Sequence, residues 1–365
     1  MDKKITILVS FSGDGGVERN VVRLVRGFLK KGVCFEILTI KEKGSFFKEL
    51  PDEAKKIKLP FDQALLNLPY LIKYLKRSSP HAIFSVKDRA NRVAILAKLF
   101  SKSSSKVVIR LGTNLSASLQ NKRNFHKWTR YLPSRILYPR CDEIIAVSKG
   151  VAEDVSKITK IPVEKINVIP NPVIDERLFE MAKEKVEDEW FLVKKRPLVL
   201  GIGRLTEQKD FETGIKAIKV LKDWGISLRY AILGDGPKKN RLKKLIKELG
   251  LEENVKLLGF KKNPYKYLSK ADLFLLSSKW EGSPNALIEA MALGVPVVST
   301  DCPSGPREIL KEEPSLLVKV EDYIGMAQAI AKTLKNPPSS EKLKHMVKDF
   351  SLEKSVNKYL KVILK

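Results

Sequence analysis

Short apolar runs rich in β-branched residues alternate with amphipathic stretches along most of the chain, and this alternation occurs twice. Strands that alternate with helices predict parallel sheets with right-handed crossovers. Almost continuously apolar strands are typical of a sheet that is covered on both faces. In the first half we predict strands at 5–9, 35–40, 82–86, 107–111, 143–147 and 166–169, with helices at 17–31, 91–100 and 149–159. In the second half we predict strands at 198–202, 229–233, 255–258, 273–276, 297–300 and 315–318, with helices at 211–224, 239–249, 264–268, 285–293 and 323–334.

Two such halves predict an α/β chain of two doubly wound, Rossmann-like domains, which suits a length of 365 residues. A proline-containing turn at 171–175 ends a strand, and a charged stretch follows at 181–196. We therefore expect a first domain at 1–175 and a second at 176–349. The N-terminal apolar run is too brief for a signal peptide and leads into glycines, so we interpret it as a strand. No stretch approaches the roughly 18 apolar residues of a membrane span.

The numbers of cysteines, histidines and charged residues limit the kinds of site and partner that the chain can have. Three cysteines, Cys34, Cys141 and Cys302, show no C-x-x-C spacing, which favours a reducing cytoplasm over a disulfide framework or a zinc site. The three histidines have no partner at metal-ligand spacing, so we expect no metal. A formal net charge of +27 favours anionic partners such as nucleic acid, acidic lipid surfaces or phosphorylated ligands.

The first strand of each half leads into a glycine-containing loop, at 12–19 and at 201–209. Glycines there let the backbone turn sharply and approach a ligand. Neither loop is a G-x-G-x-x-G or a G-x-x-x-x-G-K-[ST], which argues against a dinucleotide dehydrogenase or a P-loop ATPase. Corresponding loops in two domains indicate a ligand held between them. The turn at 234–237 is explained equally well as a structural turn and as a ligand contact.

Two cations follow the first strand of the second half. Arg204 and Lys209 both fall at the carboxyl edge of the predicted sheet. A guanidinium grips phosphate oxygens with two hydrogen bonds and an ammonium acts as a point charge, so the pair suits a diphosphate. In so basic a chain, two solvated surface cations are the alternative.

Two carboxylates flank the start of a predicted helix in the sequence EGSPNALIE at 281–289. A helix N-terminus favours an anion or a sugar hydroxyl. Glu281 lies just before that end and Glu289 about one turn inside it, so they suit two points of a polyol. An exposed helix position is the alternative for Glu289. The apolar residues around it predict a mostly buried helix instead, in which a carboxylate needs partners.

The stretch at 121–140 is basic and aromatic and contains no acidic residue. Such a segment suits the interface of an anionic membrane. An amphipathic helix that packs its apolar side inward is the alternative.

Several motifs taken together resemble those of one enzyme family. They are GGVER at 15–19, VSKGV at 147–151, VIPNP at 168–172, GRL at 203–205 with Lys209, GDGP at 234–237 and the glutamate pair of 281–289. In this combination the chain resembles the retaining glycosyltransferases of family 4, which have the GT-B fold, over almost its whole length. The stretch at 284–308 resembles members that build bacterial surface polysaccharides and lipid-linked glycans.

The resemblance implies two Rossmann-like domains that face each other across a cleft, with a C-terminal helix at 350–365 that completes the first. It implies catalytic roles for Glu281, Arg204 and Lys209. The implied donor-binding residues are Gly15, Gly16, Gly203, Gly234, Gly282, Ser283, Pro284, Asn285 and Glu289. Family members need no metal or other cofactor, since the nucleotide-sugar is a co-substrate.

One departure concerns the first domain. Many relatives carry a histidine just after the strand at 107–111, where this chain has Gly112. We expect that Arg110 or Asn114 takes its place, that His126 reaches the site instead, or that the acceptor side differs from that of the relatives.

The expected function is therefore retaining transfer of a hexose or N-acetylhexosamine from a nucleoside diphosphate sugar, with UDP as the expected nucleotide. The expected acceptor is a glycan or a lipid-linked glycan of cell-surface polysaccharide, such as lipopolysaccharide, at the cytoplasmic face of the membrane. A nucleotide-sugar epimerase of the same fold is the alternative. A nucleic-acid-binding protein is a further alternative from the charge alone, but no helix-turn-helix, zinc-finger or RNP-type signature is recognised, so no nucleic acid is expected as a partner.

Overall fold

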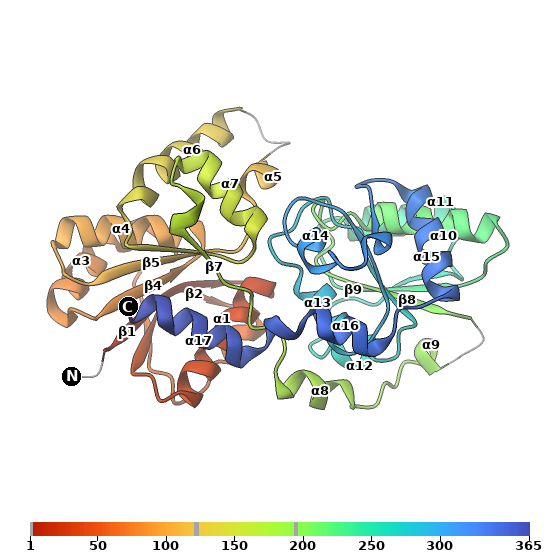
Figure 1. Ribbon diagram of the computed structural model, residues 1–365, viewed down its shortest axis with the longest axis horizontal. Coiled ribbons are helices and arrows are strands. Elements are labelled where there is room, and N and C mark those ends of the chain that lie inside the picture. The colour runs from red at the N-terminus through yellow and green to blue at the C-terminus, as the bar shows by residue number, and fades with distance from the viewer. Residues whose placement is uncertain (1–2, 120–123, 193–195) are drawn as a thin grey trace. The chain divides into compact units, whose positions relative to one another are not determined.

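The computed structural model describes residues 3–119, 124–192 and 196–365. The chain forms two compact units (Figure 1). One comprises Met1–Pro172 together with Leu352–Lys365, and the other comprises Val173–Ser351. Each unit is built around its own parallel sheet with helices on both faces. The predicted α/β class with two Rossmann-like domains is confirmed.

The first unit contains a seven-stranded sheet in the order β3-β2-β1-β4-β5-β6-β7. Its strands are β1 (Ile5–Ser12), β2 (Phe35–Lys43), β3 (Lys56–Lys58), β4 (Ala82–Val86), β5 (Lys106–Leu111), β6 (Glu143–Ala146) and β7 (Ile166–Val168). All neighbouring strands pair in parallel. From β1 the chain runs outward to β2 and β3, and it then returns to pair β4 with the other side of β1. The loops after β1 and β4 therefore start next to each other at the carboxyl edge and lead to opposite sides. That divergence is where open α/β sheets bind ligands.

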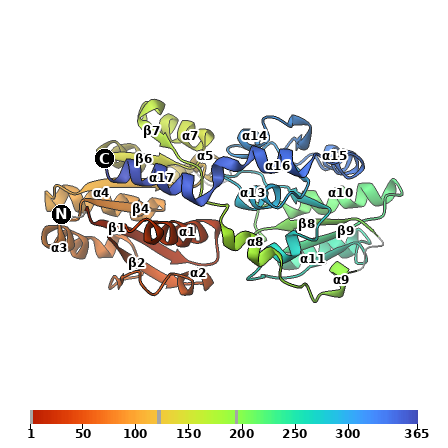
Figure 2. The same cartoon turned by 60° about the horizontal axis from the view of Figure 1, so that its bottom comes forward.

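Helices cover both faces of this first sheet. They are α1 (Gly16–Lys30), α2 (Ser45–Lys48), α3 (Leu68–Ser78), α4 (Asp88–Ser101), α5 (Leu115–Leu119), α6 (Asn124–Leu137), α7 (Lys149–Thr159) and α17 (Leu352–Ile363). Successive strand residues point to opposite faces: Ile83 packs with α3, α4 and α7, and Phe84 packs with α1 and α17. The C-terminal helix α17 thus lies beside α1 in the first unit (Figures 1 and 2).

The second unit contains a six-stranded parallel sheet in the order β10-β9-β8-β11-β12-β13. Its strands are β8 (Leu198–Ile202), β9 (Arg229–Leu233), β10 (Val255–Leu257), β11 (Leu273–Leu276), β12 (Val297–Thr300) and β13 (Leu317–Val318). Here the chain order reverses between β8 and β11. The loops that follow these two strands are therefore neighbours at the carboxyl edge.

The helices of the second unit form two layers. They are α8 (Glu176–Ala182), α9 (Glu189–Leu192), α10 (Phe211–Asp223), α11 (Lys239–Glu248), α12 (Tyr265–Leu268), α13 (Asn285–Ala292), α14 (Pro306–Ile309), α15 (Tyr323–Lys335) and α16 (Ser340–Met346). Leu200 packs in the core with α12, α13 and α16, whereas Val199 packs in the core with α10, α11 and α15. Figure 2 shows α13 beside α16 in this unit.

Some elements, such as β3 and α3, were not predicted from the hydrophobic periodicity of the sequence. The strand β3 has only three residues, two of them lysines, and lies at the edge of its sheet, where short charged strands are common. The helix α3 carries exposed apolar residues at and before its start, such as Leu65 and Tyr70, and these blur its amphipathic pattern. Within the described ranges, no helix is both long and apolar enough to cross a membrane.

Candidate active site

An ion pair joins the two loops that meet where the order of the second sheet reverses. Lys209 lies in the loop after β8 and Glu281 in the loop after β11. The Nζ atom of Lys209 stands 2.6 Å from Oε1 of Glu281. The same oxygen accepts a 2.6 Å hydrogen bond from the Ser278 hydroxyl. Glu281 is buried, and a buried carboxylate is stable only with such partners.

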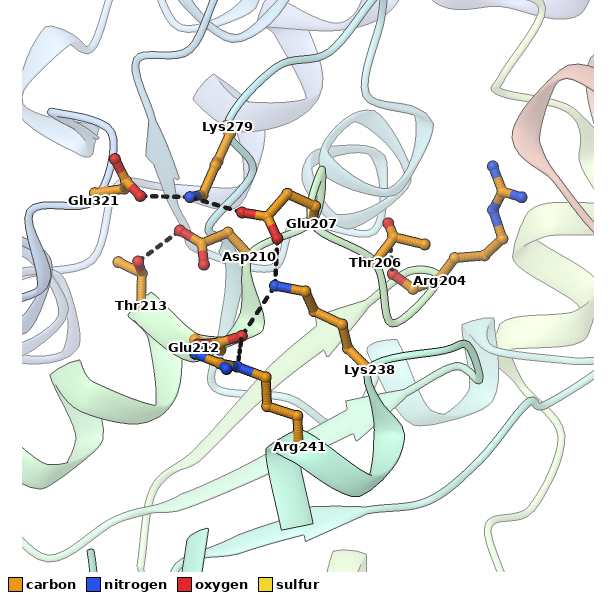
Figure 3. A network of polar contacts seen from close by, with 10 residues as sticks. All are labelled: Arg204, Thr206, Glu207, Asp210, Glu212, Thr213, Lys238, Arg241, Lys279 and Glu321. Atoms are coloured by element: carbon orange, nitrogen blue, oxygen red, sulfur yellow. Dashed lines mark hydrogen bonds and ion pairs between the residues drawn. The ribbon is translucent and has the colours of Figure 1, made fainter. Parts of the chain in front are cut away.

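Arg204 has a different environment. It lies in the same loop as Lys209, its side chain is exposed, and it forms no ion pair with any described residue. Figure 3 shows its guanidinium pointing away from the neighbouring ion pairs of Glu207. One cation at this edge therefore pairs with a carboxylate, whereas the other forms no ion pair with a described residue.

Glu289 is buried inside α13, with 1% of its surface exposed. One of its oxygens, Oε1, accepts a 3.1 Å hydrogen bond from the phenol of Tyr265 on α12. The prediction that α13 is a mostly buried helix is confirmed. Tyr265 was not predicted from the sequence, because a tyrosine 24 positions away in a different helix gives no local signal.

The start of α13 contains the predicted segment Gly282 to Asn285. Pro284 occupies the N-cap position with an extended backbone, and Asn285 is the first helical residue. The hydroxyl of Ser283 is buried and has no hydrogen-bond partner among the described residues. Since buried polar groups normally find a partner, this hydroxyl fits a site that a polar ligand completes.

Glycines bring a third loop, the one after β9, against the loop after β8. Gly203 donates its N–H to Leu233 O at 3.0 Å, and Leu205 donates to Asp235 O at 3.0 Å. Gly234 has φ +148°, and a Cβ there would lie 1.9 Å from the carbonyl oxygen of Gly203. The loops after β8 and β9 therefore lie against each other at main-chain distance, and only glycine fits at Gly234.

A network of ion pairs connects these loops (Figure 3). Glu207 pairs with Lys238 and Lys279, Lys279 also pairs with Glu321, and Glu212 pairs with Lys238 and Arg241. Hydrogen bonds from Lys238 and Lys279 lower the pKa of Glu207 to about 2. Nearby, burial raises the pKa of Asp210, which accepts a 2.6 Å hydrogen bond from Thr213.

The corresponding point of the first sheet also contains an ion pair. Lys87, directly after β4, places Nζ 2.5 Å from Oε1 of the buried Glu18 on α1. The ammonium also donates to Ser10 O at 2.7 Å and to the Ser12 hydroxyl at 2.9 Å. Lys87 adopts φ +82°, which is unusual for a residue with a side chain. Lys87 therefore anchors the loop that leads to Gly15 and Gly16, and sequence reasoning missed it.

Gly15 is the N-cap of α1, and Gly16 is its first residue. A Cβ at Gly15 would lie 2.8 Å from Oε2 of Glu18. Gly15 thus sits directly against the Glu18 carboxylate that pairs with Lys87.

The three residues expected on the acceptor side have separate surroundings. Arg110 is buried; its Nε donates to the Tyr359 hydroxyl at 2.9 Å and its Nη2 to Asn171 Oδ1 at 2.6 Å. Its Nη1 is buried without a partner among the described residues. Asn114 accepts the Ala117 N–H at 2.9 Å at the start of α5. His126 falls within α6, but its side chain lies outside the described residues.

Histidine, cysteine and acidic side chains could also support metal binding or nucleophilic chemistry. Among the described residues, no group of three or more histidine, cysteine or acidic side chains is arranged to hold a metal ion. Cys302 lies near Glu281, but burial, followed by that negative charge, raises the pKa of its thiol. A neutral, buried thiol is a poor nucleophile.

Comparison with known proteins places this geometry in a family. Glycosyl transferases group 1 matches residues 182–350, and Glycosyltransferase Family 4 matches residues 14–177. The chain is 33% identical over 357 residues to the N-acetylgalactosamine-N,N'-diacetylbacillosaminyl-diphospho-undecaprenol 4-alpha-N-acetylgalactosaminyltransferase of Campylobacter jejuni, covering 95% of this chain and 94% of that one. It is 29% identical to the lipopolysaccharide core biosynthesis glycosyltransferase LpsE of Rhizobium meliloti, covering 97% of both chains.

Solved structures agree in fold. A glycosyltransferase from Rickettsia africae superposes with a TM-score of 0.79 at 20% identity, covering 100% of this chain and 99% of that one. Anabaena HepE, solved in complex with UDP and glucose, gives a TM-score of 0.79 at 18% identity over 99% of both chains. The two doubly wound units therefore have the GT-B fold, and the 33% identity to the Campylobacter enzyme over 95% of this chain defines a glycosyltransferase. The chain belongs to the group 1, family 4 glycosyltransferases.

Proposed function

We propose that the second unit binds a nucleoside diphosphate sugar, with UDP as the nucleotide. The observation that carries this assignment is the placement of Lys209, Glu281 and Arg204 at the reversal point of the second sheet. Arg204 and Lys209 would neutralise the diphosphate, and Glu289 would hold the ribose hydroxyls. Glu281 and the segment from Gly282 to Asn285 would bind the transferred sugar, where the unpartnered Ser283 hydroxyl supplies a further polar contact.

The proposed reaction transfers the sugar with retention. The bond between the anomeric carbon and the diphosphate oxygen breaks, and the acceptor hydroxyl forms the new bond on the same face. A donor phosphate oxygen takes the hydroxyl proton. Negative charge grows on the departing diphosphate, where Arg204 and Lys209 stabilise it without a metal. Glu281, whose carboxylate pairs with Lys209 at 2.6 Å, would stabilise the positive charge that develops on the sugar.

We propose a lipid-linked glycan as the acceptor and a hexose or N-acetylhexosamine as the transferred sugar. Support comes from the Campylobacter relative, whose name specifies a diphospho-undecaprenol acceptor and an α-linked N-acetylgalactosamine. LpsE adds support from lipopolysaccharide core synthesis. The acceptor side is assigned to the first unit, around Arg110, Asn114 and His126.

A peripheral contact with the cytoplasmic face of an anionic membrane would bring the enzyme to such an acceptor. Four exposed apolar side chains support this contact: Phe61, Leu65, Leu66 and Tyr70, with Leu65 63% exposed. Cations lie close to this segment: Lys58 pairs with Asp62 at 2.9 Å, and the charges of Lys41 and Lys43 also lower the pKa of Asp62. Exposed apolar side chains with cations nearby suit an anionic lipid surface.

The predicted segment at 121–140 supports membrane contact less well. Tyr138 is buried in the core and donates a 2.5 Å hydrogen bond to Asp88 Oδ1, whereas Ile136 is exposed. The residue directly after α6 therefore packs into the core, whereas Ile136 within α6 faces outward. The side chains of 120–130 lie outside the described residues.

The test is an assay of the purified protein with a panel of UDP- and GDP-sugars and an undecaprenyl-diphosphate-linked sugar. The expected result is acceptor-dependent release of UDP with an α-linked product. Conversion of the donor to its epimer without an acceptor would favour the epimerase alternative. No consumption of any donor would contradict the proposed function.

A further inference from the structure

Glu207 links the three loops that carry the proposed donor site. It lies between Arg204 and Lys209 in the loop after β8. Its Oε1 is 3.0 Å from Nζ of Lys279, in the loop after β11, and its other oxygen pairs with Lys238, in the loop after β9. One carboxylate thus joins all three loops.

Main-chain contacts fix the same loops next to the ion pairs. The backbone N–H of Lys279 donates to Gln208 O at 2.8 Å, and the side-chain amide of Gln208 donates to Trp280 O at 3.0 Å. Lys238 donates its N–H to Leu205 O at 3.0 Å. Hydrogen bonds to residues on both sides of Glu207 therefore fix its position in the loop. The ion pairs of Glu207 add to these hydrogen bonds.

The network balances its own charge. Three cations, Lys238, Arg241 and Lys279, are paired with three carboxylates, Glu207, Glu212 and Glu321. In a chain of net charge +27, lysines beside the donor site would otherwise offer a diphosphate alternative partners. Arg204 forms no ion pair with a described residue, and its side chain points away from the network (Figure 3).

We propose that Glu207 is a positioning residue for the transfer reaction. It occupies Lys238 and Lys279 and holds the loop so that Arg204 and Lys209 meet the departing diphosphate. Its role depends on the proposed donor site, because it acts only through the two cations of that site.

The decisive variant is Glu207→Gln, which keeps the size of the side chain and removes its charge. The freed lysines still attract a diphosphate, so the dissociation constant of UDP should change less than about threefold. Turnover should fall about tenfold, because small misplacement of charge-stabilising groups acts mainly in the transition state. Lys279→Met should act in the same direction, and the double variant should be no slower than the slower single variant.

Glu248→Gln is the matched control. Glu248 forms an exposed pair with Lys244 at 3.6 Å on α11, away from the three loops, and its loss should leave both turnover and UDP binding unchanged. Unchanged turnover in Glu207→Gln would overturn the inference. So would parallel losses of turnover, UDP affinity and melting temperature, since these indicate a merely structural role.

A separate measurement distinguishes this failure from failure of the donor site. If the unmodified protein binds UDP and Arg204→Ala weakens that binding, the donor site stands whatever Glu207→Gln does. If the unmodified protein binds neither UDP nor GDP, the donor site fails and the role of Glu207 fails with it.

Discussion

Lys209 and Glu281 are 72 positions apart in the chain, yet their charged atoms stand 2.6 Å apart. They meet because β8 and β11 are neighbours in the sheet, so the loops that follow these strands lie side by side. From β8 the chain continues to β9 on one side of the sheet, and from β11 it continues to β12 on the other. The first unit repeats this relationship with Lys87 and Glu18, at 2.5 Å. Each Rossmann-like unit thus places a lysine–glutamate pair where its strand order reverses.

The Lys209–Glu281 pair predicts asymmetric effects on stability. Lys209→Ala leaves a buried carboxylate with the Ser278 hydroxyl as a partner, and should lower the free energy of unfolding by about 3 kcal/mol. Glu281→Gln keeps an acceptor for Ser278 and leaves a lysine that is 20% exposed and can reach water, so the loss should be about 1 kcal/mol. Urea unfolding measures both values. Equal losses would show that burial of the carboxylate does not govern this pair.

Gly234→Ala should destabilise the second unit strongly. The new Cβ would lie 1.9 Å from a carbonyl oxygen of the backbone, and relief requires the loops after β8 and β9 to separate. We expect a loss of more than about 3 kcal/mol. The matched control is Gly250→Ala, which also has positive φ, +62°, but meets no atom within 4 Å; it should cost about 1 kcal/mol. Thermal and urea unfolding measure both losses. If Gly234→Ala and Gly250→Ala lower the free energy of unfolding by similar amounts, the close approach of the two loops is contradicted.

Acid should selectively remove the contribution of Glu207. The pKa of its carboxylate is lowered from 4.5 to about 2 by Lys238 and Lys279. A lowered pKa stabilises the folded state above pH 4.5, and this stabilisation disappears as the pH falls toward 2. Because Glu207 is 46% exposed, the contribution should stay below about 1 kcal/mol. The measurement is urea unfolding of the native protein and of Glu207→Gln between pH 2.5 and 6, in steps of roughly half a unit. The free energies of unfolding of the two proteins should converge as the pH falls. A difference that stays constant over this range would contradict the ion pairs.

The exposed apolar residues before α3 predict membrane binding. Leu65→Ser with Leu66→Ser should reduce cosedimentation with vesicles of phosphatidylglycerol and phosphatidylcholine about tenfold, because burial of each leucine contributes roughly 1.5–3 kcal/mol when complete. Leu99→Ser with Phe100→Ser changes two similarly exposed residues at the end of α4 and should bind as the native protein does. Equal binding by both double variants would exclude the segment before α3 as the membrane contact.

Much of the fold follows from local patterns. Apolar strands such as β4 and β11 have the predicted limits, since their residues are buried on both faces. The burial of α13 likewise follows from its composition. Contacts that join distant segments required the structure: Tyr265 to Glu289, Lys87 to Glu18, and Arg110 to Tyr359. These depend on strand order and helix packing, which single-residue patterns do not encode.

The central claim is that the second unit binds the diphosphate of the donor, and calorimetric titration with UDP tests it most directly. Arg204→Ala removes an exposed cation without leaving a buried charge, so the fold should persist. The control Lys244→Ala removes a cation that is 79% exposed on α11. The predicted result is a weakening of UDP binding by about tenfold or more in Arg204→Ala, the equivalent of one charge-assisted hydrogen bond, with no change in Lys244→Ala. Native affinity in Arg204→Ala, or equal weakening in both variants, would contradict the assignment.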